Sequence, residues 1–179
     1  MKHNKIFLLL IGLLFSWSMT AQDRAAWMVE ATSIDPANYY GVTLANGVTG
    51  IVSSAEPLKV KDVVLNGAYD YYQRGRVSNI LKGFNHLNMN LDIDGRRLGA
   101  GNVQNYVQSL DMETAQLITR FTIGDKAEVS TTMMALRHLP YTAMATMTIT
   151  AKKDITITPM SVIEAPVHLT DVRNYYAEI

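Results

Sequence analysis

Apolar and polar residues alternate along much of this chain. The clearest alternation runs over residues 86–93, where Leu, Met and Ile take turns with Asn and Asp. A period of two puts the apolar side chains on one face of a β-sheet and the polar side chains in solvent. The same period predicts further strands in the second half of the chain, over residues 117–123, 127–135, 143–150 and 155–158, the last continuing the meander.

Dipeptides that favour tight turns separate the predicted strands. Asn46-Gly47 lies between short apolar runs at residues 41–44 and 48–53 and predicts a hairpin. Asp94-Gly95 tolerates positive φ and predicts a turn directly after the strand over residues 86–93. Gly124-Asp125 predicts another turn, so neighbouring strands are expected to pair in antiparallel order.

Helical spacing is scarce. Only residues 25–31 predict a short helix, whereas residues 57–65 predict one more strand, which ends at Asn66-Gly67. Many short strands separated by turn dipeptides, with no βαβ alternation, predict an all-β fold in the form of an antiparallel β-sandwich.

The first 21 residues have the order of a secretory signal peptide. Lys2 and Lys5 precede an apolar run over residues 6–15, and small residues follow as far as Ala21. The apolar run is shorter than the roughly 20 residues that a membrane span needs, although an N-terminal anchor is the alternative. We therefore predict a signal helix within residues 1–21 and a sandwich domain over residues 22–179. The mature protein would be exported to the periplasm or the cell exterior and would not contact the membrane.

Composition removes several classes of function. The 179 residues hold 16 basic and 16 acidic side chains, so the formal net charge is zero and no nucleic-acid partner is expected. The absence of cysteine excludes disulfides, thiolate metal sites and a cysteine nucleophile. A hydrophobic share of 48% is too high for a disordered chain.

No catalytic, metal or cofactor site can be assigned from the residues. Asp92 and Asp94 are too close in sequence to bracket a sugar and are interpreted as turn residues. The histidines of the mature chain, which are His86, His138 and His168, lack the spacing of zinc ligands.

The best candidates for ligand contact lie in residues 68–85, a long region without a clear pattern. Aromatic rings stack on the apolar faces of sugars, and arginines donate hydrogen bonds to hydroxyls. The candidate substrate-binding residues are Tyr69, Tyr71, Tyr72, Arg74 and Arg76. The alternative is that these tyrosines only cover the edge of the sandwich.

Six collinear segments resemble the N-terminal domain of glycoside hydrolase family 65, which includes maltose, trehalose and kojibiose phosphorylases and related α-glucosidases. The most distinctive feature is a Leu-Asp-Met sequence followed by Arg-Phe. The segments are residues 44–47 with Gly50, 65–70, 91–95, 105–112, 116–121 and the strand run over 130–157.

The resemblance implies a large sandwich of the galactose mutarotase-like kind, incomplete here, with the catalytic Glu on a separate C-terminal (α/α)6 barrel. The chain ends at Ile179 without a polar tail, which we interpret as truncation before the barrel. The fragment alone would then be inactive. Its parent would act on α-linked di- or oligosaccharides, with inverting hydrolysis favoured over phosphorolysis for an exported enzyme. The alternatives are a free-standing carbohydrate-binding module and a structural surface protein.

Overall fold

The computed structural model describes residues 24–39, 41–70 and 79–166. The predicted signal peptide lies outside these residues. Within them, two 3-10 turns, η1 (Arg24–Trp27) and η2 (Ala100–Asn102), accompany twelve strands. The strands are β1 (Met28–Ala31), β2 (Thr43–Ala45), β3 (Thr49–Ser53), β4 (Val60–Asp70), β5 (Asn79–Lys82), β6 (Asn85–Ile93), β7 (Arg96–Arg97), β8 (Gln104–Asp111), β9 (Gln116–Ile123), β10 (Ala127–Ala135), β11 (Ala143–Ala151) and β12 (Ile157–Glu164).

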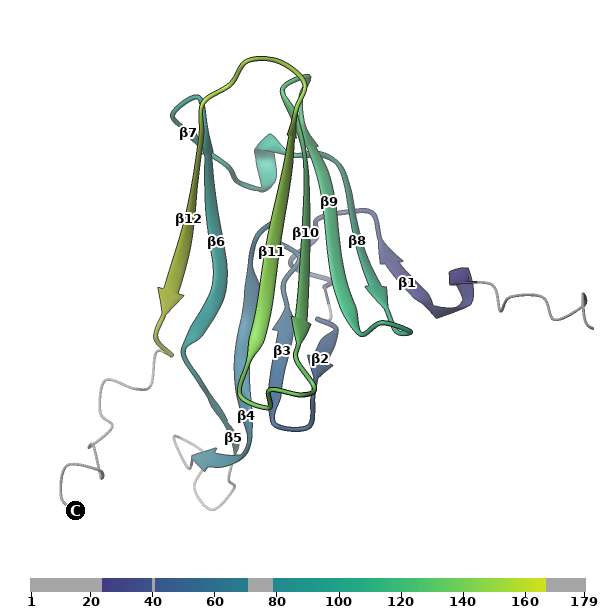
Figure 1. The fold of residues 1–179 in the computed structure, drawn as a ribbon, viewed down its shortest axis with the longest axis vertical. Helices are drawn as coiled ribbons and strands as arrows, with labels where there is room; N and C mark the ends of the chain where they lie inside the picture. The colour runs from purple at the N-terminus through teal and green to yellow at the C-terminus, as the bar shows by residue number, and fades with distance from the viewer. Residues whose placement is uncertain (1–23, 40, 71–78, 167–179) are drawn as a thin grey trace, which may run out of the picture.

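The strands form three sheets in which every pair is antiparallel. One sheet has the order β1-β8-β9-β10-β11, the second β2-β3-β4-β5, and the third β12-β6-β7. The five-stranded sheet faces the other two sheets (Figure 1). The described residues therefore confirm an all-β, sandwich-like fold. No helix among them has the length and hydropathy of a membrane span.

The core lies between the five-stranded sheet and the two smaller sheets. One buried cluster joins Ile51 and Val63 of the second sheet and Leu87 of the third to Leu117 and Met133 of the first. Leu117 and Met133 are register partners on neighbouring strands, so their side chains share one face. The alternating sequence pattern thus produces the packing: on β9 and β10 alternate positions are buried, and the positions between them are exposed or half-exposed.

Several predicted strands are confirmed within a residue or two. Those over residues 86–93, 117–123, 127–135 and 143–150 correspond to β6, β9, β10 and β11. Asp94 and Gly95 have φ values of +53° and +73°, as a tight hairpin turn requires. Asn46-Gly47 also closes a hairpin, between β2 and β3.

The predicted continuation of the meander over residues 155–158 is wrong. The strand β12 begins at Ile157 and pairs with β6 of the third sheet, with Ile157 opposite Ile93. Two hydrogen bonds of Asp94 explain why the chain leaves the five-stranded sheet after β11 and joins the third sheet. The Asp94 N–H donates to Thr156 O at 2.9 Å, and Asp94 Oδ1 accepts from Thr156 N at 3.0 Å. These bonds attach the chain to the β6–β7 turn before the strand begins.

Two shorter predictions are also corrected. Residues 25–31 do not form a helix: η1 ends at Trp27 and β1 follows, where pairing with β8 outweighs local helical spacing. The strand predicted to end at Asn66-Gly67 continues as β4 to Asp70. Gly67 has a φ of +81° at a register shift, so it makes a bulge rather than a stop.

Candidate functional site

The sequence-predicted ligand site lies mostly outside the described residues. Tyr71, Tyr72, Arg74 and Arg76 fall within residues 71–78, which the structure does not describe. The backbone of Tyr69 belongs to β4 and lies opposite Ile80 of β5. Residues 68–85, for which the sequence shows no clear pattern, therefore contain the end of β4 and all of β5. Sugar contact by these five side chains stays a prediction.

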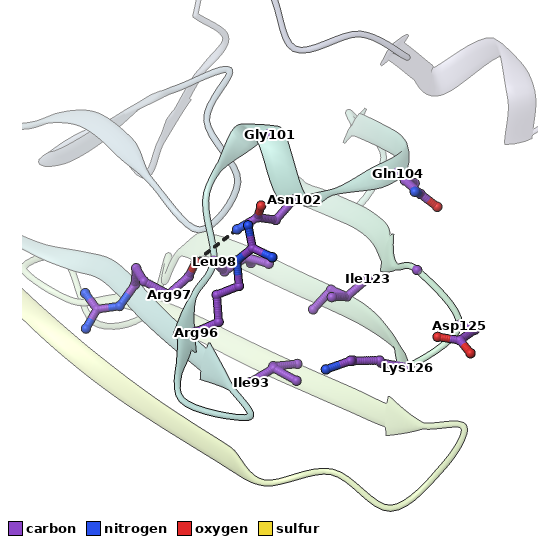
Figure 2. Close-up of a pocket in the computed structure, with 11 residues that line it drawn as sticks. Ile93, Arg96, Arg97, Leu98, Gly101, Asn102, Gln104, Ile123, Asp125 and Lys126 are labelled. Carbon is purple, nitrogen blue, oxygen red and sulfur yellow. Dashed lines mark hydrogen bonds between the residues drawn. The ribbon is translucent and has the colours of Figure 1, made fainter.

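The structure reveals a different hollow, at the end of the molecule opposite β5 (Figure 1). It has a volume of about 250 Å³ and lies between β7, η2 and the β9–β10 turn. Aliphatic side chains of Ile93, Leu98 and Ile123 line it, and polar side chains surround them (Figure 2). The prominent polar residues of this rim are Arg96, Arg97, Asn102, Gln104, Asp125 and Lys126.

Local hydrogen bonds position the two arginines and the residues after them. The Asp94-Gly95 turn reverses the chain, so that Arg96 lies opposite Ile93 in the register. Beyond β7, Leu98 N donates to Leu91 O at 2.9 Å, which directs Leu98 toward the core. Asn102 Nδ2 then donates to Arg97 O at 3.0 Å and closes the loop.

Ion pairs neutralise most charges around this hollow. Arg97 pairs with Asp92, and Lys126 pairs with Asp94. The hydrogen bond from Lys126 lowers the pKa of Asp94, with a further contribution from the Thr156 N–H.

A second turn aspartate is held in the same way. Lys153 Nζ lies 2.7 Å from Asp125 Oδ2 and lowers the pKa of Asp125 by its hydrogen bond. Asp94 lies in the predicted turn, but the prediction that Asp92 is a turn residue is wrong, because Asp92 belongs to β6 and lies opposite Arg97. Both carboxylates form ion pairs rather than standing free in solvent.

Three carboxyl groups have a pKa that is lowered by hydrogen bonds, those of Asp35, Asp94 and Asp125. A lowered pKa is the opposite of what the general acid of a glycosidase needs. Asp62 and Glu164 lie beside a second hollow and form ion pairs of 3.0 Å with Lys82 and 3.3 Å with Lys59. The described part of the chain also contains no cluster of three or more His, Asp or Glu side chains that could hold a metal.

The half-buried Tyr39 belongs to a polar cluster that the sequence did not suggest. Tyr39 Oη lies 2.6 Å from Ser53 Oγ and also donates to Gln108 Oε1 at 2.5 Å. Gln108 Nε2 in turn donates to Ser54 O at 3.0 Å, so the cluster joins β8 to the end of β3. Tyr106 lies outside this cluster, and its buried Oη has no hydrogen-bond partner within the described residues. Burial raises the pKa of both tyrosines, so both hydroxyls are neutral.

The packed antiparallel sheets of the described residues define a β-sandwich domain. Comparison with known families identifies the kind of domain more specifically. The model of the glycosyl hydrolase family 65 N-terminal domain matches residues 41–179, which is most of the chain. The chain therefore belongs to glycosyl hydrolase family 65 and carries its N-terminal domain, as the six segments predicted.

Two curated relatives match nearly the whole chain. A kojibiose hydrolase of Mucilaginibacter mallensis is 51% identical over 98% of this chain, which corresponds to 26% of the relative. A kojibiose hydrolase of Flavobacterium johnsoniae is 42% identical over 99% of this chain and 25% of the relative. The chain thus spans about a quarter of the length of these relatives.

Proposed function

We propose that this chain is the non-catalytic N-terminal domain of an exported enzyme that hydrolyses α-linked glucosides, with kojibiose as the substrate. The observation that carries the proposal is the 51% identity, over 98% of the chain, to a protein named kojibiose hydrolase. The lowered pKa values and ion pairs of the described carboxylates support a scaffold role for the domain itself.

The catalytic groups would lie in a following (α/α)6 barrel, the arrangement implied by the family resemblance. Relatives about four times as long as this chain leave ample length for such a domain. In an inverting reaction a carboxylic acid protonates the leaving oxygen while a base-activated water attacks the opposite face of the sugar. The sandwich would support the barrel and take no part in either proton transfer.

The substrate proposal is tested on the polypeptide in which this domain is followed by its barrel. We expect glucose release from kojibiose, with the β-anomer formed first and no requirement for phosphate. Proton NMR of the first turnovers distinguishes the anomers. Strict phosphate dependence, or inactivity toward kojibiose beside activity on another α-linked disaccharide, would overturn the proposal.

Export is a separate part of the proposal and rests on the order of residues 1–21. Expression in a Gram-negative host, followed by mass spectrometry of the periplasmic fraction, tests it. We expect a mature N-terminus at Gln22. Recovery only of uncleaved protein in the cytoplasm would contradict export.

A free-standing carbohydrate-binding module remains the competing function and depends on the tyrosines near residue 70. It predicts that the chain alone is retained on an immobilised α-glucan and that replacing Tyr71 and Tyr72 with Ala removes the retention. The scaffold proposal predicts no retention of either protein.

A further inference from the structure

One cation at the hollow of Figure 2 has no counter-ion among the described residues. Arg97, Lys126 and Lys153 each pair with an aspartate. Within the described part of the chain no ion pair reaches Arg96, whose side chain is exposed. Figure 2 shows Arg96 extending from β7 toward Asn102, whereas Arg97 points to the other side of the strand. The rim therefore carries one unbalanced positive charge.

The interior of the hollow combines an aliphatic surface with a hydrogen-bond acceptor. Ile93, Leu98 and Ile123 form the aliphatic surface. Asn102 uses Nδ2 to bond Arg97 O, and no described residue donates to its Oδ1, which is left to accept a hydroxyl. The volume of about 250 Å³ lies below the roughly 300–1,000 Å³ of sites for drug-sized ligands. The hollow therefore suits a molecule no larger than one sugar unit.

We propose that this hollow binds a single sugar-sized carboxylic acid, for which a hexuronate is the matching chemical class. The planar guanidinium of Arg96 presents paired donors that fit a carboxylate. The C–H face of the sugar ring would lie on the aliphatic surface, and a ring hydroxyl would donate to Asn102 Oδ1. A neutral hexose leaves Arg96 unpaired, and acetate leaves the aliphatic surface uncovered. The proposal does not depend on the activity of the parent enzyme.

Saturation-transfer NMR on the full 179-residue chain at low micromolar concentration tests the proposal. The probes are D-glucuronate, D-glucose, acetate and inorganic phosphate. The site is open to solvent, so we expect millimolar binding of glucuronate, about tenfold tighter than that of the other three probes. Arg96→Gln should weaken glucuronate binding about tenfold, the effect of losing one charge-assisted hydrogen bond.

Arg120→Gln is the matched control, because Arg120 is also an exposed arginine, lies on β9 and does not line this hollow. We expect it to bind glucuronate as the unaltered chain does. Equal binding of glucuronate and glucose, or full affinity in a folded R96Q variant, would overturn the proposal. Phosphate binding as tight as that of glucuronate would also overturn it, because the hollow would then be a general anion patch. If the R96Q variant does not fold, the proposal stands or falls on the order in which the four probes bind the unaltered chain.

Discussion

Asn88 and Val60 connect the two smaller sheets: Asn88 Oδ1 accepts a hydrogen bond from the Val60 backbone N–H at 2.7 Å. Asn85 completes the connection, because its Nδ2 donates to Val60 O at 2.9 Å. Both asparagines are almost fully buried, at 2% and 6% exposure. These two amide hydrogen bonds join β4 to β6, so the two smaller sheets act as one layer of the sandwich.

Replacing Asn88 with Leu should destabilise the domain by about 2–3 kcal/mol, because a buried backbone N–H loses its acceptor. Urea unfolding followed by far-UV circular dichroism measures the effect. His86→Ala is the control, since His86 is an exposed residue of the same strand and should change stability by less than about 0.5 kcal/mol. Equal stabilities of the two variants would contradict the structural role of Asn88.

Gly41 is predicted to be intolerant of any side chain. A Cβ at this position would lie 2.7 Å from the backbone oxygen of Ser53, which cannot move without disturbing β3. Gly41→Ala should therefore cost about 1–3 kcal/mol, the usual range for overpacking. Gly99→Ala is the control, because a Cβ there would have no neighbour within 4 Å and the φ of −152° suits any residue. If the two variants unfold at the same urea concentration, this packing argument fails.

Asp94 should contribute to acid stability. Its pKa is lowered from 3.8 in the folded protein, mainly by the Lys126 hydrogen bond. The folded state therefore binds this proton less readily than the unfolded state does. The stabilisation is fully present above pH 3.8 and is lost as the pH falls through the lower, folded pKa.

The variant Asp94→Asn keeps a residue that tolerates the positive φ of this turn but removes the charge. Its urea midpoint should lie below that of the unaltered chain at pH 7, and the difference should shrink below about pH 4. Asp154→Asn, at an exposed residue of the β11–β12 connection, is the control. A difference in urea midpoint that stays constant across the whole pH range would refute the contribution of the Asp94 charge.

The isolated domain, residues 22–179, should be poorly soluble. On the edge strand β12, Ile157 is 36% and Ile163 is 74% exposed, and Val29 on the edge strand β1 is 53% exposed. Exposed apolar side chains on unpaired edges promote association. We expect light scattering to detect oligomers at micromolar concentration.

Replacing Ile157 and Ile163 with Thr should reduce the association, and Ser161→Ala on the same strand should not. A monomeric, cooperatively melting domain without any substitution would count against this account.

Local sequence predicted strands well where alternation and turn chemistry agree, as at β6 and the Asp94-Gly95 turn. It could not predict which sheet β12 joins, because that choice depends on Asp94 bonding Thr156 across 62 residues of sequence. The hollow at Arg96 was missed for a similar reason. Its signal, a tight turn followed by two arginines and two nearby glycines, becomes a site only when the β9–β10 turn lies beside it.

The sequence was sufficient to predict the family because its six segments lie in the correct order along the chain, and the match over residues 41–179 confirms the family. Asn88 could not be recognised as buried from the local pattern. Within β6 it occupies a position between the inward-facing apolar residues, where a polar residue is expected to face solvent, yet it is only 2% exposed because it bonds Val60 of the neighbouring sheet.

Assaying the purified chain with kojibiose decides whether this domain is a scaffold whose catalytic partner lies elsewhere in the protein. We expect no glucose above the buffer blank from the 179-residue chain, and steady glucose release once the domain is joined to its barrel. Glucose release by the chain alone would show that the domain itself is catalytic.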